Sequence, residues 1–194
     1  AMKEKDSEFY NEVYRSGGWN GFYFKEAEEI APYFPTWLYV YQHIKMNGID
    51  SVLDLGCGVG HFASLFSDKD NIFYNGIDFS NEAIEQAEER NESNPNCSFE
   101  VLDLRLVNFD LVEFVTAFEF FEHISFDLDI VTRLEKDTEI FFSVPNYDSA
   151  GHVRLFKDYE SIVERYGELL ELELIHELKT NKKNVIFLCR GIRK

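Results

Sequence analysis

A glycine-rich turn directly after a short apolar run is the first feature of the sequence that could do chemistry. The run Ser51–Leu55 is typical of a buried central strand, and Gly56, Gly58 and Gly60 follow it. Glycine lets the backbone fold sharply and approach a ligand closely, because it has no Cβ. The N–H groups at the start of a short helix, expected over residues 61–66, point into this turn. The stretch therefore predicts a strand–loop–helix device that holds a nucleoside-bearing ligand.

The spacing of the glycines narrows the class of ligand. A dinucleotide fingerprint is Gly-x-Gly-x-x-Gly, whereas here the third glycine, Gly60, comes one residue earlier and His61 occupies the dinucleotide position. Read from Asp54, the motif Asp-x-Gly-x-Gly-x-Gly resembles the first motif of the class I methyltransferases that depend on S-adenosylmethionine (SAM). In that family the loop faces the amino-acid part of SAM. A tight turn without a ligand is the alternative interpretation of this motif alone.

Two acidic residues follow predicted strands farther along the chain. Asp78 ends the strand expected over residues 71–78, in the register where a carboxylate accepts both ribose hydroxyls, and Ser80 can cap the helix expected over residues 81–90. In the resembling family, an acid at the position of Asp103 binds the adenine amino group; a plain turn residue is the alternative. The resemblance assigns these residues to SAM and its product S-adenosylhomocysteine (SAH): Asp54, Gly56, Cys57, Gly58, Gly60, Asp78, Phe79, Asp103, Leu104 and Glu119.

Acidic and histidine side chains after the next two predicted strands could hold a metal. Glu119, Glu122 and His123 are spaced i, i+3, i+4, which predicts one face of a helical turn, and His152 follows the strand expected over residues 139–144. Two carboxylates and two imidazoles suit Mg, Mn, Fe or Zn. A similar Glu-x-x-Glu-His element with a distal histidine holds Mg in the small-RNA 2′-O-methyltransferases, so the resemblance implies a divalent metal at these four residues. The alternative is that His123 or His152 is itself the catalytic general base.

Candidates for binding the methyl acceptor lie outside these motifs. Residues 17–24 form a glycine-hinged aromatic segment that could close over cofactor and substrate as a lid, or could only cover the sheet. Arg154 could recognise a carboxylate or phosphate, and a surface ion pair is an equal alternative. The predicted substrate-binding residues are Trp19, Tyr23, Asn146 and Arg154.

The order of the predicted elements indicates an α/β fold. Strands alternate with helices and the chain ends in two strands joined by a short turn, which predicts a mostly parallel sheet with an antiparallel hairpin at one edge. The resemblance implies the three-layer, Rossmann-like methyltransferase fold, a seven-stranded sheet of order 3-2-1-4-5-7-6. Two departures shorten this scaffold: almost no helix separates the third and fourth strands, and Lys136-Asp137 replaces the usual turn before the fifth strand.

Composition limits the class of partner. The chain has 194 residues, with 19 basic and 36 acidic side chains and a formal charge of −17. This charge opposes nucleic acids and anionic membranes. Three cysteines without metal spacing fit a reduced, cytoplasmic setting, and no apolar run is long enough to span a bilayer. We expect one domain over residues 1–194, with an N-terminal cap over 1–50 and the core over 51–194, as a monomer or homodimer.

These features together predict a SAM-dependent methyltransferase that acts on a small-molecule or sugar-like acceptor, at oxygen. Two alternatives stay open: a SAM-binding partner subunit without catalysis, and an N-methyltransferase of a small amine. A dinucleotide-dependent oxidoreductase is disfavoured, because Gly60 and His61 break the dinucleotide spacing.

Overall fold

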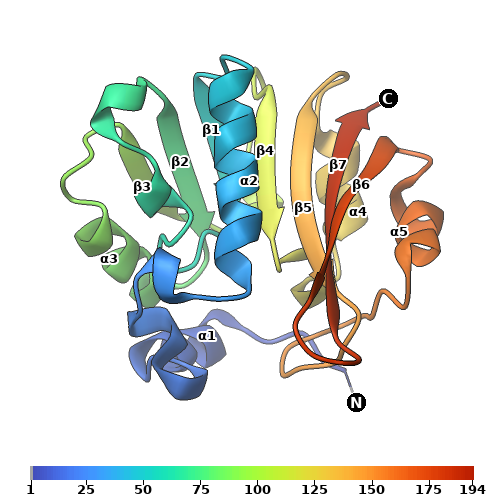
Figure 1. Cartoon of the computed structure of the whole chain (residues 1–194), viewed down its shortest axis with the longest axis horizontal. Helices are drawn as coiled ribbons and strands as arrows, with labels where there is room; N and C mark the ends of the chain where they lie inside the picture. The colour runs from blue at the N-terminus through green and yellow to red at the C-terminus, as the bar shows by residue number, and fades with distance from the viewer. Residues whose placement is uncertain (1) are drawn as a thin grey trace. The chain divides into compact units, whose positions relative to one another are not determined.

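The computed structural model describes residues 2–194 and has an α/β fold (Figure 1). Its seven strands form one sheet of order β3-β2-β1-β4-β5-β7-β6. The order confirms the predicted fold class. The strands are β1 (Ser51–Leu55), β2 (Phe73–Asp78), β3 (Cys97–Val101), β4 (Phe114–Phe118), β5 (Glu139–Pro145), β6 (Leu170–Lys179) and β7 (Val185–Arg193).

Five α-helices and six short 3₁₀ turns lie before or between the strands within the described residues. No helix in residues 2–194 is both long enough and apolar enough to cross a bilayer. The helices are α1 (Ser7–Arg15), α2 (Tyr33–Met46), α3 (Asn81–Arg90), α4 (Asp127–Arg133) and α5 (Tyr159–Tyr166). The turns are η1 (Trp19–Phe24), η2 (Ala27–Glu29), η3 (Ala63–Leu65), η4 (Asp68–Asp70), η5 (Leu104–Leu106) and η6 (Phe121–His123).

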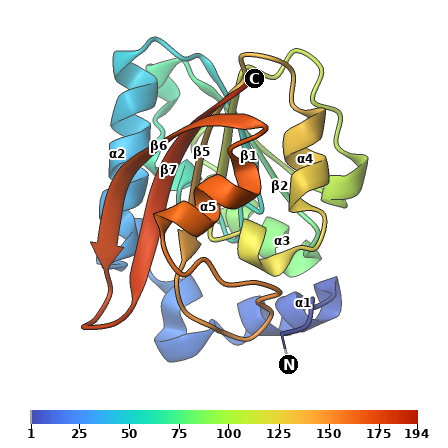
Figure 2. The same cartoon turned by 90° about the vertical axis from the view of Figure 1, so that its right-hand side faces the viewer.

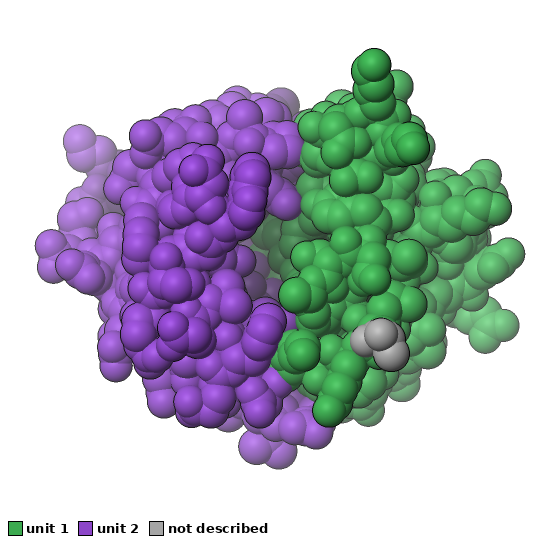
Figure 3. All heavy atoms as spheres, turned by 90° about the horizontal axis from the view of Figure 1, so that it is seen from below, with its two compact units in different colours: residues 1–5, 107–194 green, residues 6–106 purple. Residues whose placement is uncertain are grey.

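The chain divides into two compact units, which Figure 3 colours separately. Unit 2 holds residues 6–106 and contains the glycine-rich turn. Unit 1 holds residues 107–194 with a short N-terminal stretch, and it contains the predicted metal ligands. The prediction of a single domain remains a prediction.

Unit 2 is built on three parallel strands, with β2 paired to β1 on one side and to β3 on the other. Helix α2 lies over one face of these strands and α3 over the other (Figures 1 and 2). Residues 52–55 of β1 are all buried, as expected for a central strand covered on both faces. Helix α1 packs beside α3. Packing against these helices therefore fixes the ends of β1 and β2, where the glycine turn and Asp78 lie.

Unit 1 combines one parallel and two antiparallel strand pairs. Strand β4 pairs parallel with β5, and β7 pairs antiparallel with both β5 and β6. Its core is rich in aromatic side chains: Phe121, Phe141, Phe142, Phe156 and Tyr166 are nearly inaccessible to solvent. This apolar packing holds the segments that follow β4 and β5, which carry the predicted metal ligands.

One local expectation was wrong: the segment after the glycine turn forms only the short η3 and not a helix over residues 61–66. Helix α2 begins at Tyr33 and carries Pro35 in its first turn, where a proline is tolerated. Phe126 is the N-cap residue of α4 and makes no side-chain cap hydrogen bond.

Candidate active site

The glycine turn after β1 needs glycine for its backbone conformation. Gly56, Gly58 and Gly60 all have positive φ angles, of 66°, 55° and 80°. Residues with a Cβ adopt this left-handed backbone conformation only at a cost of roughly 1–2 kcal/mol each. The loop is also anchored to the sheet, because the Cys57 N–H donates to the carbonyl of Ile77, 3.0 Å away. The three glycines therefore set a fixed concave backbone at the end of β1.

Asp78 is fixed beside this turn at the end of β2. Its Oδ2 accepts a hydrogen bond from the Gly58 N–H at 3.0 Å, and its Oδ1 accepts one from the Ser80 N–H at 2.9 Å. Burial raises the pKa of its carboxyl to about 6. The Ser80 hydroxyl accepts from the Ala83 N–H and so caps α3 as predicted. The carboxylate at the end of β2 and the glycine turn thus form one rigid arrangement.

The other residues predicted to bind the cofactor lie in different surroundings. Asp54 is buried and accepts a hydrogen bond from the Tyr74 hydroxyl, which gives it a role inside the sheet. Half-buried Phe79 packs its ring against Tyr10, with centroids 5.5 Å apart. Asp103 pairs with Arg105 at 2.7 Å, and its neighbour Leu104 is buried.

The N-terminal segment packs onto the glycine turn. The ring of Tyr14 contacts Val59, and its hydroxyl would lie 3.5 Å from a Cβ placed on Gly58. Tyr23 packs edge-on against Tyr14, with ring centroids 4.7 Å apart. Trp19 is 86% exposed. Of the two aromatic residues predicted to bind the acceptor, Tyr23 is therefore close to the glycine turn and Trp19 presents its ring to solvent.

Two residues that sequence reasoning did not assign to the site hold this segment in place. Arg90, in the last turn of α3, donates to the carbonyls of Val59 at 3.1 Å and Tyr23 at 3.0 Å. It also donates to the carbonyl of Lys25 at 3.1 Å, and the His61 ring bonds the same carbonyl at 2.8 Å. An arginine in the last turn of a helix is an ordinary helix-dipole signal, so the sequence carried no sign of these long-range contacts.

His61 gives a pH dependence that can be measured. Burial lowers the pKa of His61 to about 4 from its ordinary 6.5. Below pH 6.5 the unfolded chain binds a proton that the folded chain does not bind until about pH 4, so this residue lowers the free energy of unfolding as the pH falls through that window. We expect wild type to lose up to about 3 kcal/mol relative to His61→Phe, since one pKa unit corresponds to about 1.4 kcal/mol.

Urea unfolding of both proteins at pH 7 and at pH 4.5 measures this difference. Phenylalanine preserves the ring stacked on Trp37, whose centroid lies 5.6 Å from that of His61. An equal loss of stability in the two proteins between these pH values would contradict the prediction.

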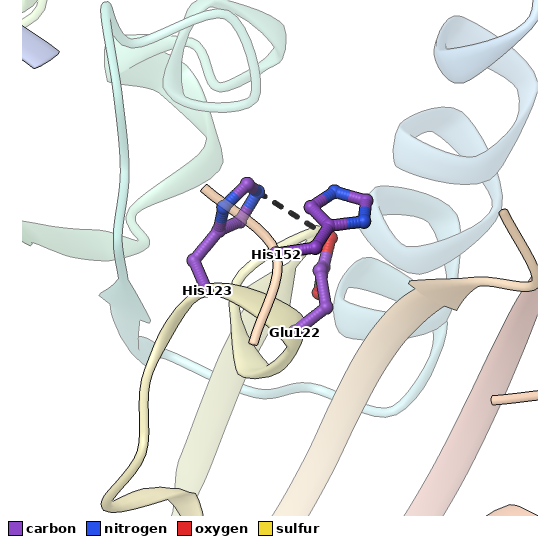
Figure 4. Close-up of side chains that lie close together, drawn as sticks. All are labelled: Glu122, His123 and His152. Atoms are coloured by element: carbon purple, nitrogen blue, oxygen red, sulfur yellow. Dashed lines mark ion pairs between the residues drawn. The ribbon is translucent and has the colours of Figure 1, made fainter. Parts of the chain in front are cut away.

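Glu122, His123 and His152 bring one carboxylate and two imidazoles together in unit 1 (Figure 4). One ligand atom from each lies within 4.8 Å of the other two. His123 Nε2 is 3.7 Å from a carboxylate oxygen of Glu122, and the two imidazole centroids are 4.7 Å apart. Glu122 and His123 come from η6 after β4, and His152 comes from the loop after β5.

The protonation of the two imidazoles suits a cation. The Nδ1 of His152 bonds the carbonyl of Tyr147 at 3.0 Å, so a proton on Nδ1 leaves Nε2 with a free lone pair. Burial and the neighbouring His152 lower the pKa of His123 to about 4, which keeps it neutral. The Oε2 of Glu122 is buried and has no hydrogen-bond partner in the described part of the chain. A buried oxygen of this kind could serve as a cation ligand once Glu122 has lost its proton, since metal ligands must be neutral imidazoles and carboxylates.

Glu119 does not join this cluster. It has a positive φ of 47°, which turns it away from the η6 segment, so the expected common helical face is not formed. Its carboxylate accepts a hydrogen bond from the Ser143 hydroxyl at 3.1 Å, and burial raises its pKa to about 8. The structure thus brings together three of the four predicted metal ligands.

The remaining predicted acceptor residues make internal contacts. The Asn146 side chain accepts from the Val185 N–H at 2.8 Å and donates to the carbonyl of Lys183 at 3.2 Å, which ties the loop after β5 to the β6–β7 hairpin. Arg154 donates to the carbonyls of Phe121 and Ile124. These contacts favour structural roles for both side chains.

A match to a known domain covers the glycine turn and two of the three cluster residues. The family model described as a methyltransferase domain matches residues 52–135. That range includes Asp78, Glu122 and His123, and it ends before His152. No curated protein matches the sequence.

Solved structures share the fold at low sequence identity. The magnesium protoporphyrin IX methyltransferase of Synechocystis PCC 6803, solved with bound SAM, has a TM-score of 0.70 at 14% identity, and the alignment covers 100% of both chains. The N-methyltransferase NodS of Bradyrhizobium japonicum WM9, solved with SAH, has a TM-score of 0.64 at 16% identity, covering 84% of this chain and 88% of that one. EvdMO1 has a TM-score of 0.63 at 16% identity; the alignment covers 82% of this chain but only 40% of EvdMO1.

Proposed function

We propose that this chain is a class I SAM-dependent methyltransferase, which its matched domain and its fold support, and that it transfers the methyl group of SAM to a hydroxyl of a small molecule. The observation that carries the proposal is the Asp78 carboxylate held beside the glycine turn by the Gly58 N–H at 3.0 Å. A carboxylate at the end of the second strand is placed to accept the two ribose hydroxyls of a nucleoside. The turn, one residue shorter than a dinucleotide loop, suits a ligand without pyrophosphate.

The chemistry required of the protein follows from the cofactor. The sulfonium of SAM already makes its methyl group electrophilic, so the protein must exclude water and align the acceptor behind that methyl group. An alcohol is a poor nucleophile at neutral pH, and it needs help to lose its proton. Methylation at oxygen is therefore the reaction in which the Glu122, His123 and His152 cluster would have a role, that of helping the hydroxyl to lose its proton.

We assign this cluster to the acceptor. The residues that would hold a divalent cation are Glu122, His123 and His152; a set of one carboxylate and two imidazoles suits Mn, Fe or Zn, and Mg is the candidate that the family resemblance adds. A cation bound there would lower the pKa of an acceptor hydroxyl. Without it, His152 has a free Nε2 lone pair that could take the hydroxyl proton directly, with Nδ1 oriented by the Tyr147 carbonyl.

The charge of the chain favours a small acceptor. A net charge of −17 repels polyanions over distances near the Debye length, about 8 Å at physiological salt. A small polyhydroxylated or catechol-like molecule has no array of negative charges, so the chain does not repel it. Two adjacent oxygens of such a molecule could also bind the same cation. A nucleic acid acceptor would need a local basic surface to offset this repulsion.

Cofactor binding is the first test of the proposal. We expect isothermal calorimetry to detect binding of SAM and SAH and to detect none with NAD. Asp78→Ala should weaken SAH binding by about tenfold to a hundredfold, since it removes the acceptor of one or two charge-assisted hydrogen bonds. Asp129→Ala is the matched control, because this exposed carboxylate pairs with Arg133 on α4.

Binding of NAD without binding of SAH would overturn the cofactor assignment. The acceptor is tested with radiolabelled SAM against two panels, one of vicinal diols and catechols and one of primary amines, with and without Mn²⁺. Transfer only to the diols or catechols supports methylation at oxygen, and transfer only to amines supports the N-methyltransferase alternative. SAH binding without transfer to either panel, or to a larger acceptor set, favours a partner subunit.

A further inference from the structure

A fully buried carboxylate at the start of α4 binds two arginines, one of which also contacts the segment that carries Glu122 and His123. Asp127, at the start of α4, is 0% exposed. Its carboxylate pairs with Arg165 at 2.7 and 2.8 Å and with Arg154 at 3.1 Å, and it accepts from the Tyr166 hydroxyl at 2.6 Å. A buried charge is costly unless it is paired in this way, so the four side chains behave as one packed network.

Arg154 differs from Arg165 in what else it binds. Within the described residues, the Arg165 guanidinium donates its hydrogen bonds to Asp127 alone. Arg154 also donates from Nη1 to the carbonyl of Phe121 and, at 2.5 Å, to that of Ile124. These two carbonyls flank Glu122 and His123 along the chain. Arg154 therefore ties the segment that carries two cluster residues to the buried Asp127.

The backbone next to Arg154 makes the same connection. The Val153 N–H donates to the carbonyl of Glu122 at 2.7 Å, and Val153 lies between His152 and Arg154. The Asp127–Arg154 pair thus holds residues 152–154 and residues 121–124 side by side. His152 is otherwise anchored within its own loop, through Nδ1 to the carbonyl of Tyr147 and through its N–H to the carbonyl of Ser149 at 3.1 Å. The position of its ring relative to Glu122 therefore depends on this backbone contact.

We propose that Arg154, anchored by Asp127, is a positioning residue that fixes His152 against Glu122 and His123 and so sets the geometry of the acceptor cluster. The inference rests on the proposed function for the meaning of the cluster. It replaces the prediction that Arg154 binds the substrate: a guanidinium fork that already serves one carboxylate and two carbonyls has few donors left for a ligand.

Arg154→Ala and Arg165→Ala form the matched pair that tests this inference. Both variants remove one partner of Asp127, so both should lower the melting temperature. Loss of a residue that orients metal ligands typically weakens metal binding by about tenfold to a hundredfold. We expect that loss of Mn²⁺ affinity, measured by calorimetry with Mn²⁺ alone, in Arg154→Ala only. We also expect the visible spectrum of bound Co²⁺ to change in that variant only, while SAH affinity stays unchanged in both.

Equal Mn²⁺ affinity in the two variants would overturn the inference and leave Arg154 a merely stabilising residue. If Arg154→Ala does not fold, Arg154→Lys keeps a charge beside Asp127, but its single amine cannot also reach both carbonyls; it should weaken Mn²⁺ binding as well. If wild type binds no Mn²⁺, the metal assignment fails separately. The amide exchange of Val153, measured by NMR, then decides: faster exchange in Arg154→Ala than in Arg165→Ala supports positioning, and equal exchange rejects it.

Discussion

Replacing Gly60 with alanine is expected to lower the free energy of unfolding by about 2–5 kcal/mol, the sum of left-handed backbone strain and overpacking. Gly60 has a φ of +80°, and a Cβ there would lie 2.6 Å from Asn91 Nδ2 and 3.0 Å from Ala87 Cβ. The Asn91 amide cannot move away freely, because it donates to the carbonyls of Gly60 and Ala87. Urea unfolding measures the loss, and SAH affinity should fall with it because the turn must shift.

Gly48→Ala is the control that separates strain from close packing. Gly48 has a similar φ of +64°, but no atom lies within 4 Å of a Cβ placed on it. This variant should lose only the strain, about 1–2 kcal/mol, and should bind SAH like wild type. Equal destabilisation by the two substitutions would contradict the prediction that Ala87 and Asn91 leave no room for a Cβ on Gly60.

The sheet could be predicted because its signals are local and agree with one another. The bounds of α3 are those expected, with Ser80 as its cap, and β4 begins and ends where its apolar residues do. A hydrophobic strand, a capped helix and a turn each depend on neighbouring residues. The strand order then followed from the family resemblance and is confirmed.

Long-range contacts of polar side chains could not be predicted in the same way. Arg90 reaches the carbonyls of three residues that lie 31 to 67 positions away, and no local pattern indicates which carbonyls an arginine will meet. Arg154 was equally open to a ligand or an ion pair, and only the fold shows Asp127 beside it. The role of a side chain that binds distant backbone can be seen only in the tertiary structure.

The sequence placed Glu119 in the cluster with Glu122, His123 and His152, and the backbone after β4 explains why Glu119 lies elsewhere. The i, i+3, i+4 spacing assumes a regular helix after β4. The chain instead places Glu119 at a φ of 47° and forms only the short η6. Glu122 and His123 are adjacent in sequence and remain together, but Glu119 turns toward Ser143. A spacing argument fails where a single residue leaves the helical conformation.

Replacing Glu122 with glutamine should abolish Mn²⁺ binding and lower methyl transfer to a hydroxyl acceptor by about a hundredfold or more, the scale of activation by a metal or a general base. The substitution keeps the shape of the side chain, but an amide cannot lose a proton to become the carboxylate that a cation requires. SAH affinity should not change, because the residues assigned to the ribose lie on β2 and the glycine turn. Calorimetry with Mn²⁺ and with SAH, together with the radiolabel assay, measures the three quantities.

The stability of Glu122→Gln distinguishes a functional carboxylate from a structural one. Burial, with the neighbouring Glu119 carboxylate, raises the pKa of the Glu122 carboxyl well above its usual range, and its Oε2 has no partner in the described residues. A buried group of this kind weakens the fold, so the neutral variant should melt no lower than wild type while losing activity. Asp129→Asn is the control: this exposed carboxylate pairs with Arg133 on α4, and the variant should keep its Mn²⁺ affinity. A variant Glu122→Gln that melts much lower, or that still binds Mn²⁺, would show that this carboxylate supports the fold instead of a cation.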